Sequence, residues 1–303
     1  MPSRTIRPDG PLALGATVAC LRHGASDPTC RVRGGEWWFG EATPAGAATI
    51  HLRQLADGTV EAEAWGEGAD WSLDRAPGLV GLEDDRSGFV AHDELAAAGL
   101  KANPGWRVAK SRLVTQSLMP AIIEQRVTGK EAFAGHARLV RRFGAPAPGP
   151  GERLGLMTPP APREWARIPS WEWLGAGIDR ARSAAAVRAS SLAGRIEECA
   201  DLPLAQAHSR LRSLPGVGEW TAAEVAQRAL GDPDSPSFGD YHFAKNLTWA
   251  LDGVIGDDDR ARELLAPYAG HRYRAAVYIG MAAGLRPRRG PRMTLPTHLP
   301  RVH

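Results

Sequence analysis

The first third of the chain alternates apolar and polar residues, a pattern typical of β-strands that bury one face. This alternation, with its β-branched and aromatic residues, predicts strands at Ala16–Leu21, Glu36–Ala42, Ala48–Leu55 and Thr59–Gly66. The short sequence Ala-Asp-Gly at residues 56–58 has the composition of a hairpin turn between the last two strands. We therefore expect a small antiparallel sheet in this part of the protein.

From about Lys110 onwards the spacing of apolar residues changes to the period of an α-helix. This period predicts helices at Ser111–Val127, Lys130–Phe143, Trp171–Ala176, Ile178–Cys199, Leu204–Leu214, Glu219–Leu230, Tyr241–Leu251, Asp257–Tyr268 and Arg272–Gly284. Residues 144–162 are too rich in proline and glycine to belong to either kind of element.

A block of strands followed by a block of helices predicts an α+β fold. We divide the chain into a β-rich N-terminal domain (residues 1–105), a helical domain (106–285) and a basic C-terminal tail (286–303). A chain of 303 residues is long enough for two or three packed units with a sizeable core.

The net charge of +3 is small, but the charges are unevenly distributed. Acidic residues dominate between Asp57 and Glu94, whereas the C-terminal tail carries arginines and no acid. A basic end and an acidic face suit an anionic partner that approaches from one side. The alternative is that genome composition favours arginine over lysine throughout this chain.

The sequence also argues against several classes of protein. No run of about 18 apolar residues is present, so we expect no membrane span, and the first ten residues lack the apolar core of a secretory signal. The cysteines, Cys20, Cys30 and Cys199, include no C-x-x-C pair, which indicates a reducing compartment and argues against a zinc or iron–sulfur site. We therefore expect a cytoplasmic protein.

The most informative stretch is LPGVGEWTAAEVAQRALGDPDSPSFGD, from Leu214 to Asp240. Its first two glycines, Gly216 and Gly218, allow positive φ and a close approach of the backbone. N–H groups at the start of the following helix are then free to bind a phosphate, a contact that does not depend on nucleotide sequence. The other interpretation is an ordinary corner between two helices.

The motif L-P-G-V-G-x-W-T-A, followed about 20 residues later by G-D-Y, resembles the helix-hairpin-helix DNA glycosylases. Within them it is most similar to the 3-methyladenine DNA glycosylase II branch, over roughly residues 106–285. The resemblance implies a monofunctional DNA glycosylase of base excision repair that flips out alkylated purines and hydrolyses their N-glycosidic bond. A glycosylase for deaminated or other damaged bases, and a non-catalytic DNA-binding protein, remain the alternatives.

The resemblance assigns the chemistry to Asp240, which directly precedes a predicted helix and would otherwise be an ordinary N-cap. Breaking a glycosidic bond leaves positive charge on the sugar, which a carboxylate can stabilise while it orients water. Trp220 lies where lyase members carry a nucleophilic lysine, so no lyase activity is expected. Its indole offers a flat face to a flipped base, unless it only packs in the core.

Glu224 lies one turn after Trp220 and shares its helix face, so it is a second candidate for the base pocket. The position is commonly aromatic in the alkyl-purine branch, and Glu224 departs from that pattern. Its carboxylate could accept a hydrogen bond from an exocyclic amine or attract a cationic base. It could equally form a structural ion pair with Arg228, and the sequence does not separate the two roles.

Gln125 matches the family's residue beside the gap that a flipped nucleotide leaves, and Arg126 falls where the branch often has an apolar wedge. A guanidinium can stack on a base and also bind a base edge or a phosphate. We expect both residues to contact DNA, together with Gly216, Gly218 and Thr221. A solvated helix end is the alternative for Arg126.

The resemblance also implies a monovalent cation, Na⁺ or K⁺, held by the backbone carbonyls of Arg212, Leu214 and Val217. We expect no required cofactor and no iron–sulfur cluster, because no cysteine follows Cys199. The expected partner is double-stranded DNA with damaged bases, bound by a monomer that is associated with the nucleoid.

Overall fold

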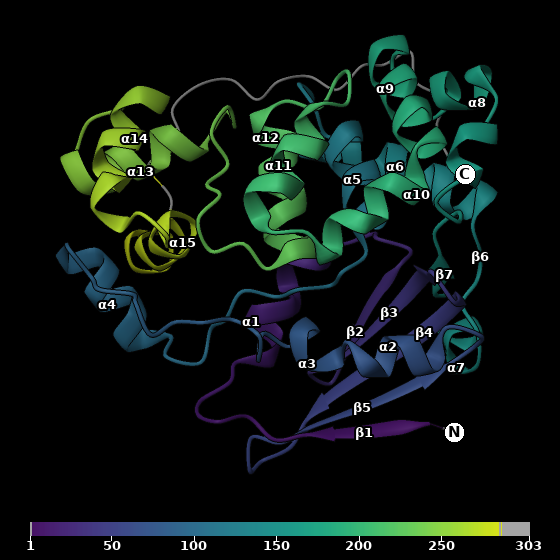
Figure 1. Cartoon of the computed structure of the whole chain (residues 1–303), viewed down its shortest axis with the longest axis horizontal. Coiled ribbons are helices and arrows are strands. Elements are labelled where there is room, and N and C mark those ends of the chain that lie inside the picture. Colours follow the sequence, from purple (N-terminus) through teal and green to yellow (C-terminus); the bar gives the residue numbers. More distant parts are fainter. Residues whose placement is uncertain (1, 285, 287–303) are drawn as a thin grey trace.

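A five-stranded antiparallel sheet forms the N-terminal part of the computed structural model, which describes residues 2–284 and 286 (Figure 1). The strands, in the order β1-β5-β4-β3-β2, are β1 (Ser3–Ile6), β2 (Cys30–Arg33), β3 (Glu36–Thr43), β4 (Gly46–Gln54) and β5 (Val60–Trp65). Along β5 the alternate residues Val60, Ala62 and Ala64 are buried, which is the pattern that predicted the strand. The antiparallel sheet and the α+β class are confirmed.

The prediction of a first strand at Ala16–Leu21 was wrong. Helix α1 (Leu14–Val18) and the 3₁₀ turn η1 (Ala19–Leu21) occupy this position. Leu14, Thr17 and Val18 are buried together, and their spacing of three and four residues places them on one face of a helix. In a strand, the neighbours Thr17 and Val18 would point to opposite faces.

Short helices and a proline-rich segment complete the sheet part. Helices α2 (Ala69–Asp74) and α3 (Ala76–Leu79) join the core of the sheet through Leu73 and Leu79. In residues 144–162, strands β6 (Ala145–Pro146) and β7 (Met157–Thr158) pair on either side of helix α7 (Pro150–Arg153). The Thr49 hydroxyl donates to the carbonyl of Pro148 at 2.7 Å, so this segment packs on β4.

Helix α5 (Val114–Ile123) is at the centre of the helical part, and all of its residues except Gln116 are buried. The helices packed with it are α6 (Gly129–Phe143), α8 (Ser170–Gly175), α9 (Arg180–Ser191), α10 (Ala193–Glu197), α11 (Leu204–Arg212) and α12 (Glu219–Val225). The short turns η2 (Glu164–Arg167) and η3 (Glu198–Asp201) are 3₁₀, and η4 (Ala226–Leu230) continues α12 as a π-helical turn.

Two of the predicted helices differ most from the structure. The helix expected at Ser111–Val127 begins at Val114, because the N–H groups of Ser111 and Arg112 instead donate to carbonyls at the end of the α12–η4 helix. The helix expected at Ile178–Cys199 is interrupted at Leu192, between α9 and α10.

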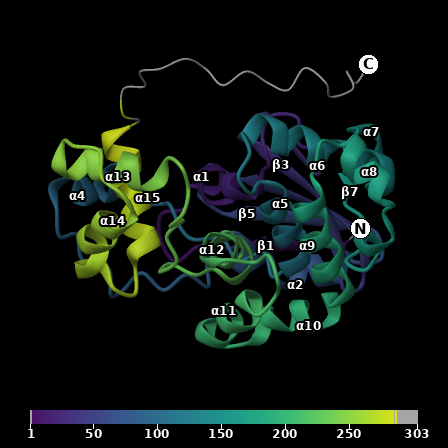
Figure 2. The same ribbon diagram turned by 90° about the horizontal axis from the view of Figure 1, so that it is seen from above.

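A second helical core contains α4 (Glu94–Ala102), α13 (Phe243–Asp252), α14 (Asp258–Leu265), the 3₁₀ turn η5 (Ala266–Tyr268) and α15 (Arg272–Ala283). Figures 1 and 2 show α4 beside α13 and α15, although these two helices come much later in the sequence. Helix α4 precedes residue 105, the expected end of the N-terminal domain, so packing continues across that boundary. The predicted tail, residues 286–303, lies outside the described residues except for Arg286.

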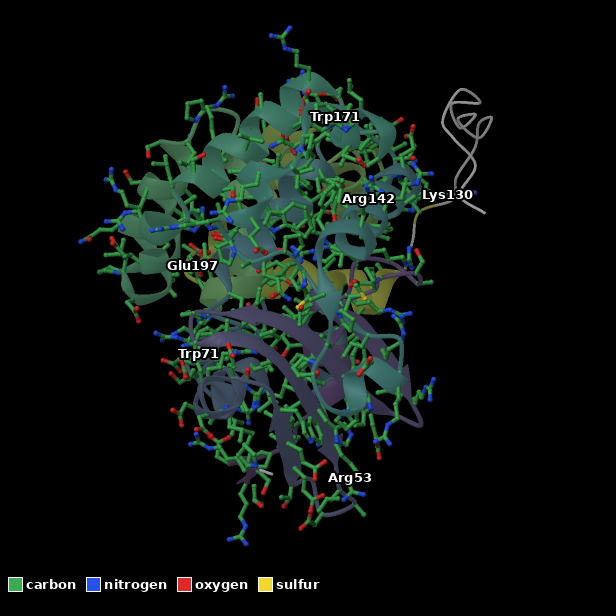
Figure 3. The ribbon with its side chains drawn as sticks, turned by 90° about the vertical axis from the view of Figure 1, so that its right-hand side faces the viewer. Arg53, Trp71, Lys130, Arg142, Trp171 and Glu197 are labelled. Carbon is green, nitrogen blue, oxygen red and sulfur yellow. The ribbon has the colours of Figure 1, made fainter. Side chains whose placement is uncertain are left out.

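The sheet part and the helical part form two layers. Figure 3 shows the sheet side with Arg53 and Trp71, and the helical side with Trp171 and Arg142. Glu197, also labelled there, accepts the N–H groups of Val114 and Thr115 at 3.1 and 2.8 Å, and so caps the central helix α5. Within residues 2–284 and 286, no helix has the length and apolar character needed to cross a bilayer.

Candidate active site

Three segments that are distant in sequence meet at the start of helix α12. They are the turn at residues 124–127 after α5, the hairpin turn at residues 213–218 between α11 and α12, and the loop at residues 231–242 before α13.

The hairpin turn is held by its two apolar residues. Leu214 and Val217 are buried, and the N–H of Val217 donates to the carbonyl of Leu214 at 3.0 Å. Gly216 has φ +92°, and a Cβ there would lie 2.7 Å from the Cβ of Ala185 on α9. Gly218 has open space around the same position, and no side chain caps the helix that follows it. The two glycines therefore do different things: Gly216 allows packing, and Gly218 leaves the helix start accessible.

Gln125 joins the turn after α5 to the hairpin. Its amide nitrogen donates to the carbonyl of Gly216 and to the hydroxyl of Thr221, both at 2.8 Å. Thr221 is buried, and its hydroxyl helps to fix the Gln125 side chain against the hairpin. Arg126 is exposed and has φ +55°, in a turn and not at the end of a helix as predicted.

Asp240 is half-buried and uses one carboxylate oxygen to begin helix α13. Its Oδ1 accepts the N–H groups of His242 and Phe243 at 2.7 and 2.8 Å. The helix begins at Phe243, two residues later than predicted. No described residue forms a hydrogen bond with Oδ2 of Asp240.

Trp220 lies against the segment that carries Asp240. A Cβ on Gly239 would be 3.6 Å from the Cβ of Trp220. The indole Nε1 of Trp220 and the ring Nδ1 of His242 are both buried without a hydrogen-bond partner among the described residues. Buried polar atoms are rarely unpaired in native proteins, and these two belong to residues next to the segment that carries Asp240. His242 was not predicted as a site residue, and its only signal in the sequence is its position two residues after Asp240.

Glu224 uses both of its carboxylate oxygens within the protein. Oε2 contacts Arg228 at 2.6 Å, and Oε1 accepts the hydroxyl of Ser237 at 2.6 Å. Arg228 also donates from Nε to the carbonyl of Cys20 at 2.9 Å. Burial acts to lower the pKa of Arg228, but the charge of Glu224 and other negative groups raise it overall. The ion pair that the sequence allowed is therefore present.

Further contacts hold the loop that carries Asp240. Gln227 donates to the carbonyl of Ser235 at 2.6 Å and to the hydroxyl of Ser237 at 3.1 Å. His208 on α11 contacts Asp232 at 2.8 Å. Burial acts to raise the pKa of Asp232, but hydrogen bonds from His208, Ser235 and the backbone lower it overall. Sequence reasoning missed these residues, because they meet only through the fold.

The carbonyls expected to hold a cation, those of Arg212, Leu214 and Val217, lie at the end of α11 and in the hairpin turn. The Leu214 carbonyl accepts one hydrogen bond, and a carbonyl oxygen has a second lone pair that can face an ion. The turn is therefore compatible with such an ion, which stays a prediction.

Solved structures of DNA glycosylases share this fold. The 3-methyladenine DNA-glycosylase from Archaeoglobus fulgidus superposes with a TM-score of 0.76 at 19% sequence identity, over 92% of this chain and 98% of that one. The Clostridium acetobutylicum 8-oxoguanine glycosylase/lyase superposes with a TM-score of 0.70 at 11% identity, over 93% and 97%. The resemblance stated from the hairpin motif is confirmed at the level of fold.

In sequence, the chain is 32% identical over 170 residues to a Mycobacterium tuberculosis protein, the "probable bifunctional transcriptional activator/DNA repair enzyme AlkA". That match covers 52% of this chain and 32% of the relative, so the chain spans about a third of the length of the curated relatives it matches. No protein-family model matches the chain.

Proposed function

We propose that this chain, which has the fold of DNA glycosylases, is a monofunctional DNA glycosylase that removes alkylated purines such as 3-methyladenine from double-stranded DNA. The observation that carries the proposal is the Asp240 carboxylate, with Oδ1 fixed by two N–H groups and Oδ2 unpaired among the described residues. The 32% identical relative, with DNA repair in its name, supports it. We expect the protein to act as a monomer on chromosomal DNA in the cytoplasm.

The reaction needs one carboxylate and one water. The bond between C1′ and the base nitrogen breaks, the base leaves with the bonding electrons, and positive charge develops on the sugar. The free oxygen of Asp240 stabilises that charge, orients the water that adds to C1′ and accepts the proton that this water loses. A cationic alkylated purine leaves as a neutral base, so this reaction requires no general acid.

Trp220 supports hydrolysis without strand cleavage. A lyase needs a nucleophilic amine that attacks C1′, and an indole has none. Lys245, the nearest lysine in sequence, has its ammonium 3.6 Å from the centre of the Tyr241 ring, in a cation–π contact. The flat indole face suits stacking on an extruded base.

The hairpin supplies the proposed contact with the DNA backbone. N–H groups at the start of α12, beginning at the open Gly218, would bind a phosphate. The carboxylate of Glu219 in this first turn would repel the phosphate. Arg262 forms an ion pair with Glu219 at 2.8 Å, which offsets this negative charge. A monovalent cation held by the carbonyls of Arg212, Leu214 and Val217 would add positive charge beside that phosphate. Arg126, on its exposed turn, would enter the duplex.

A panel of duplexes that each contain one lesion tests the proposal. Single-turnover excision should be found for alkylated purines and should leave an intact abasic site. Deaminated and oxidised bases in the same sequence context serve as comparisons. Excision of deaminated bases alone would overturn the substrate class, and excision of none would overturn the proposed function.

A further inference from the structure

We propose that Glu224 is a positioning residue for Asp240, acting through Ser237, and that it does not read the flipped base. The inference rests on the proposed function, because it concerns the same reaction. It decides between the two roles that the sequence left open for Glu224.

The first step is the contact between Glu224 and Ser237. The two residues lie on different elements, α12 and the loop before α13, and their side chains are 2.6 Å apart. Arg228 fixes the other carboxylate oxygen at 2.6 Å and is itself anchored on the carbonyl of Cys20. Glu224 therefore presents a rigid acceptor at the place where the loop must pass.

The second step leads from Ser237 to Asp240 through the backbone. The N–H of Asp240 donates to the carbonyl of Ser237 at 3.1 Å, which closes a tight turn, and Gly239 within it has φ +89°. Gln227 holds the same serine hydroxyl from the next turn of the helix, at 3.1 Å. Because the turn is short and closed, a displacement of Ser237 displaces the carboxylate of Asp240.

Glu224 has little capacity left to bind a base. The residue is 8% exposed, and each carboxylate oxygen already has a partner. A base that took one of these hydrogen bonds would have to displace Ser237 or separate a buried ion pair. Separating such a pair is strongly unfavourable, because it leaves an uncompensated charge in the interior.

The functional consequence concerns distance. A catalytic group misplaced by about 1 Å can reduce a rate by about 10²-fold. If Ser237 loses its hydroxyl, its hydrogen bonds with Glu224 and Gln227 are lost while Glu224 and Arg228 stay paired. Ser237→Ala should therefore lower the single-turnover rate constant by about 10-fold to 10²-fold. The factor should be the same for every lesion, since the base is not involved.

The experiment compares Ser237→Ala and Ser237→Thr with the wild-type chain, on two alkylated lesions of different size. We expect Ser237→Thr to restore most of the rate, because it keeps a hydroxyl. The same Ser237→Ala change made in an Asp240→Asn background should have no further effect on the residual rate. Rate losses that differ between lesions, or that persist undiminished in the Asp240→Asn background, would overturn the proposal. Ser237 variants are preferred because Glu224→Gln leaves Arg228 unpaired and can unfold the protein.

Binding to an analogue of the charged sugar gives a readout that does not require excision. A duplex with a cationic pyrrolidine in place of the sugar imitates the transition state, and one with a neutral tetrahydrofuran does not. Ser237→Ala should weaken binding to the pyrrolidine duplex about 10-fold and leave the tetrahydrofuran duplex unchanged. Equal losses of affinity for both duplexes would mean that the loop contributes to DNA binding in general and does not position Asp240 against the charged sugar. This result would also overturn the proposal. If the wild-type chain does not distinguish the duplexes and excises no base, the proposed function fails first.

Discussion

Asp240 has one engaged carboxylate oxygen and one unpaired oxygen, and this asymmetry determines what its replacement should do. In Asp240→Asn the amide oxygen can still accept the N–H groups of His242 and Phe243, so the start of α13 and the fold should be retained. The negative charge beside the sugar is lost. Excision should fall by roughly 10²-fold or more, with DNA binding preserved, as measured by single-turnover kinetics and fluorescence anisotropy.

Asp70→Asn is the matched control for that prediction. Asp70 is an exposed acid in the first turn of α2, in the sheet part, so its substitution removes the same charge from another part of the molecule. Its excision rate should equal that of the wild-type chain. An Asp240→Asn variant that excised as fast as this control would eliminate the proposed role of the carboxylate.

Trp220 makes a second prediction at the scale of one residue. Because an indole cannot form a Schiff base, sodium borohydride added during the reaction should trap no covalent protein–DNA complex. The measurement is denaturing electrophoresis of labelled duplex, with a known lyase as the positive control. A trapped band that disappears in Lys245→Ala would show that this lysine leaves the Tyr241 ring and attacks the sugar.

At the scale of elements, the two glycines of the hairpin turn have different roles: Gly216 allows packing against α9, and Gly218 is the proposed phosphate contact. Gly218→Ala places a methyl group in open space at a φ of −91°, so folding should be unaffected. The methyl group would obstruct phosphate, and affinity for damaged and undamaged duplex should fall together by about 10-fold, the equivalent of one charge-assisted hydrogen bond. Gly216→Ala, by contrast, collides with Ala185 and should lower the thermal midpoint. A loss confined to one lesion in Gly218→Ala would contradict this division.

The turn after α5 makes a second prediction for an element. Arg126 sits at a φ of +55°, which non-glycine residues rarely adopt, and its side chain is exposed. If it fills the gap left by the extruded nucleotide, Arg126→Ala should slow excision from a fully paired duplex. The excision rate on mispaired substrates should stay close to that of the wild-type chain, since their bases are easier to extrude. Arg126→Gly keeps the left-handed backbone without strain and should give the same pattern, which separates the side chain from the shape of the turn. Equal slowing on both substrates would make Arg126 an ordinary phosphate contact.

At the scale of the whole molecule, a buried histidine between the layers should make stability depend on pH. His136 on α6 stacks on Trp165 and lies 5.5 Å from the ring of His23. Burial, then the neighbouring charge of His23, lowers the pKa of His136 from 6.5 to about 4. The unfolded chain therefore binds this proton below about pH 6.5, whereas the folded chain does not bind it until about pH 4. Stability should fall as the pH is lowered through that window.

The measurement is urea denaturation at pH 7.5 and pH 5.0. His136 should contribute roughly 2 kcal/mol to the drop in the unfolding free energy of the wild-type chain, which is the linkage for one histidine shifted over that interval. His136→Phe keeps an aromatic ring against Trp165 and cannot titrate, so most of the drop should disappear. An unchanged pH dependence in that variant would assign the effect to other groups.

The molecule also shows which features a sequence can predict. Strands β3, β4 and β5 followed from alternation, whereas the edge strands β1 and β2 were not predicted. The hairpin and Asp240 followed from a motif of about 27 contiguous residues. Contacts between segments that are distant in the sequence could not be predicted from local patterns. Gln125 meets Gly216 across 91 residues, and Ser237 meets Glu224 from a loop with no periodic pattern. Helix α4 did have a local signal, an Asp93 N-cap before an alanine-rich run, which the β-rich interpretation of its neighbourhood obscured.

Helix α4 has a consequence for the order in which the protein is made. Its core partners on α13, α14 and α15 are synthesised much later, and the adjoining buried ion pair of Asp84 with Arg274 spans 190 residues. At about 5–20 residues per second, a ribosome takes roughly 10–40 s to cover that distance. During most of this interval the apolar face of α4 lacks its partners on α13, α14 and α15, and a holdase that binds exposed apolar segments has time to reach it. The nascent chain should therefore be most sensitive to proteolysis near residues 94–102, and it should lose that sensitivity when α15 has left the exit tunnel.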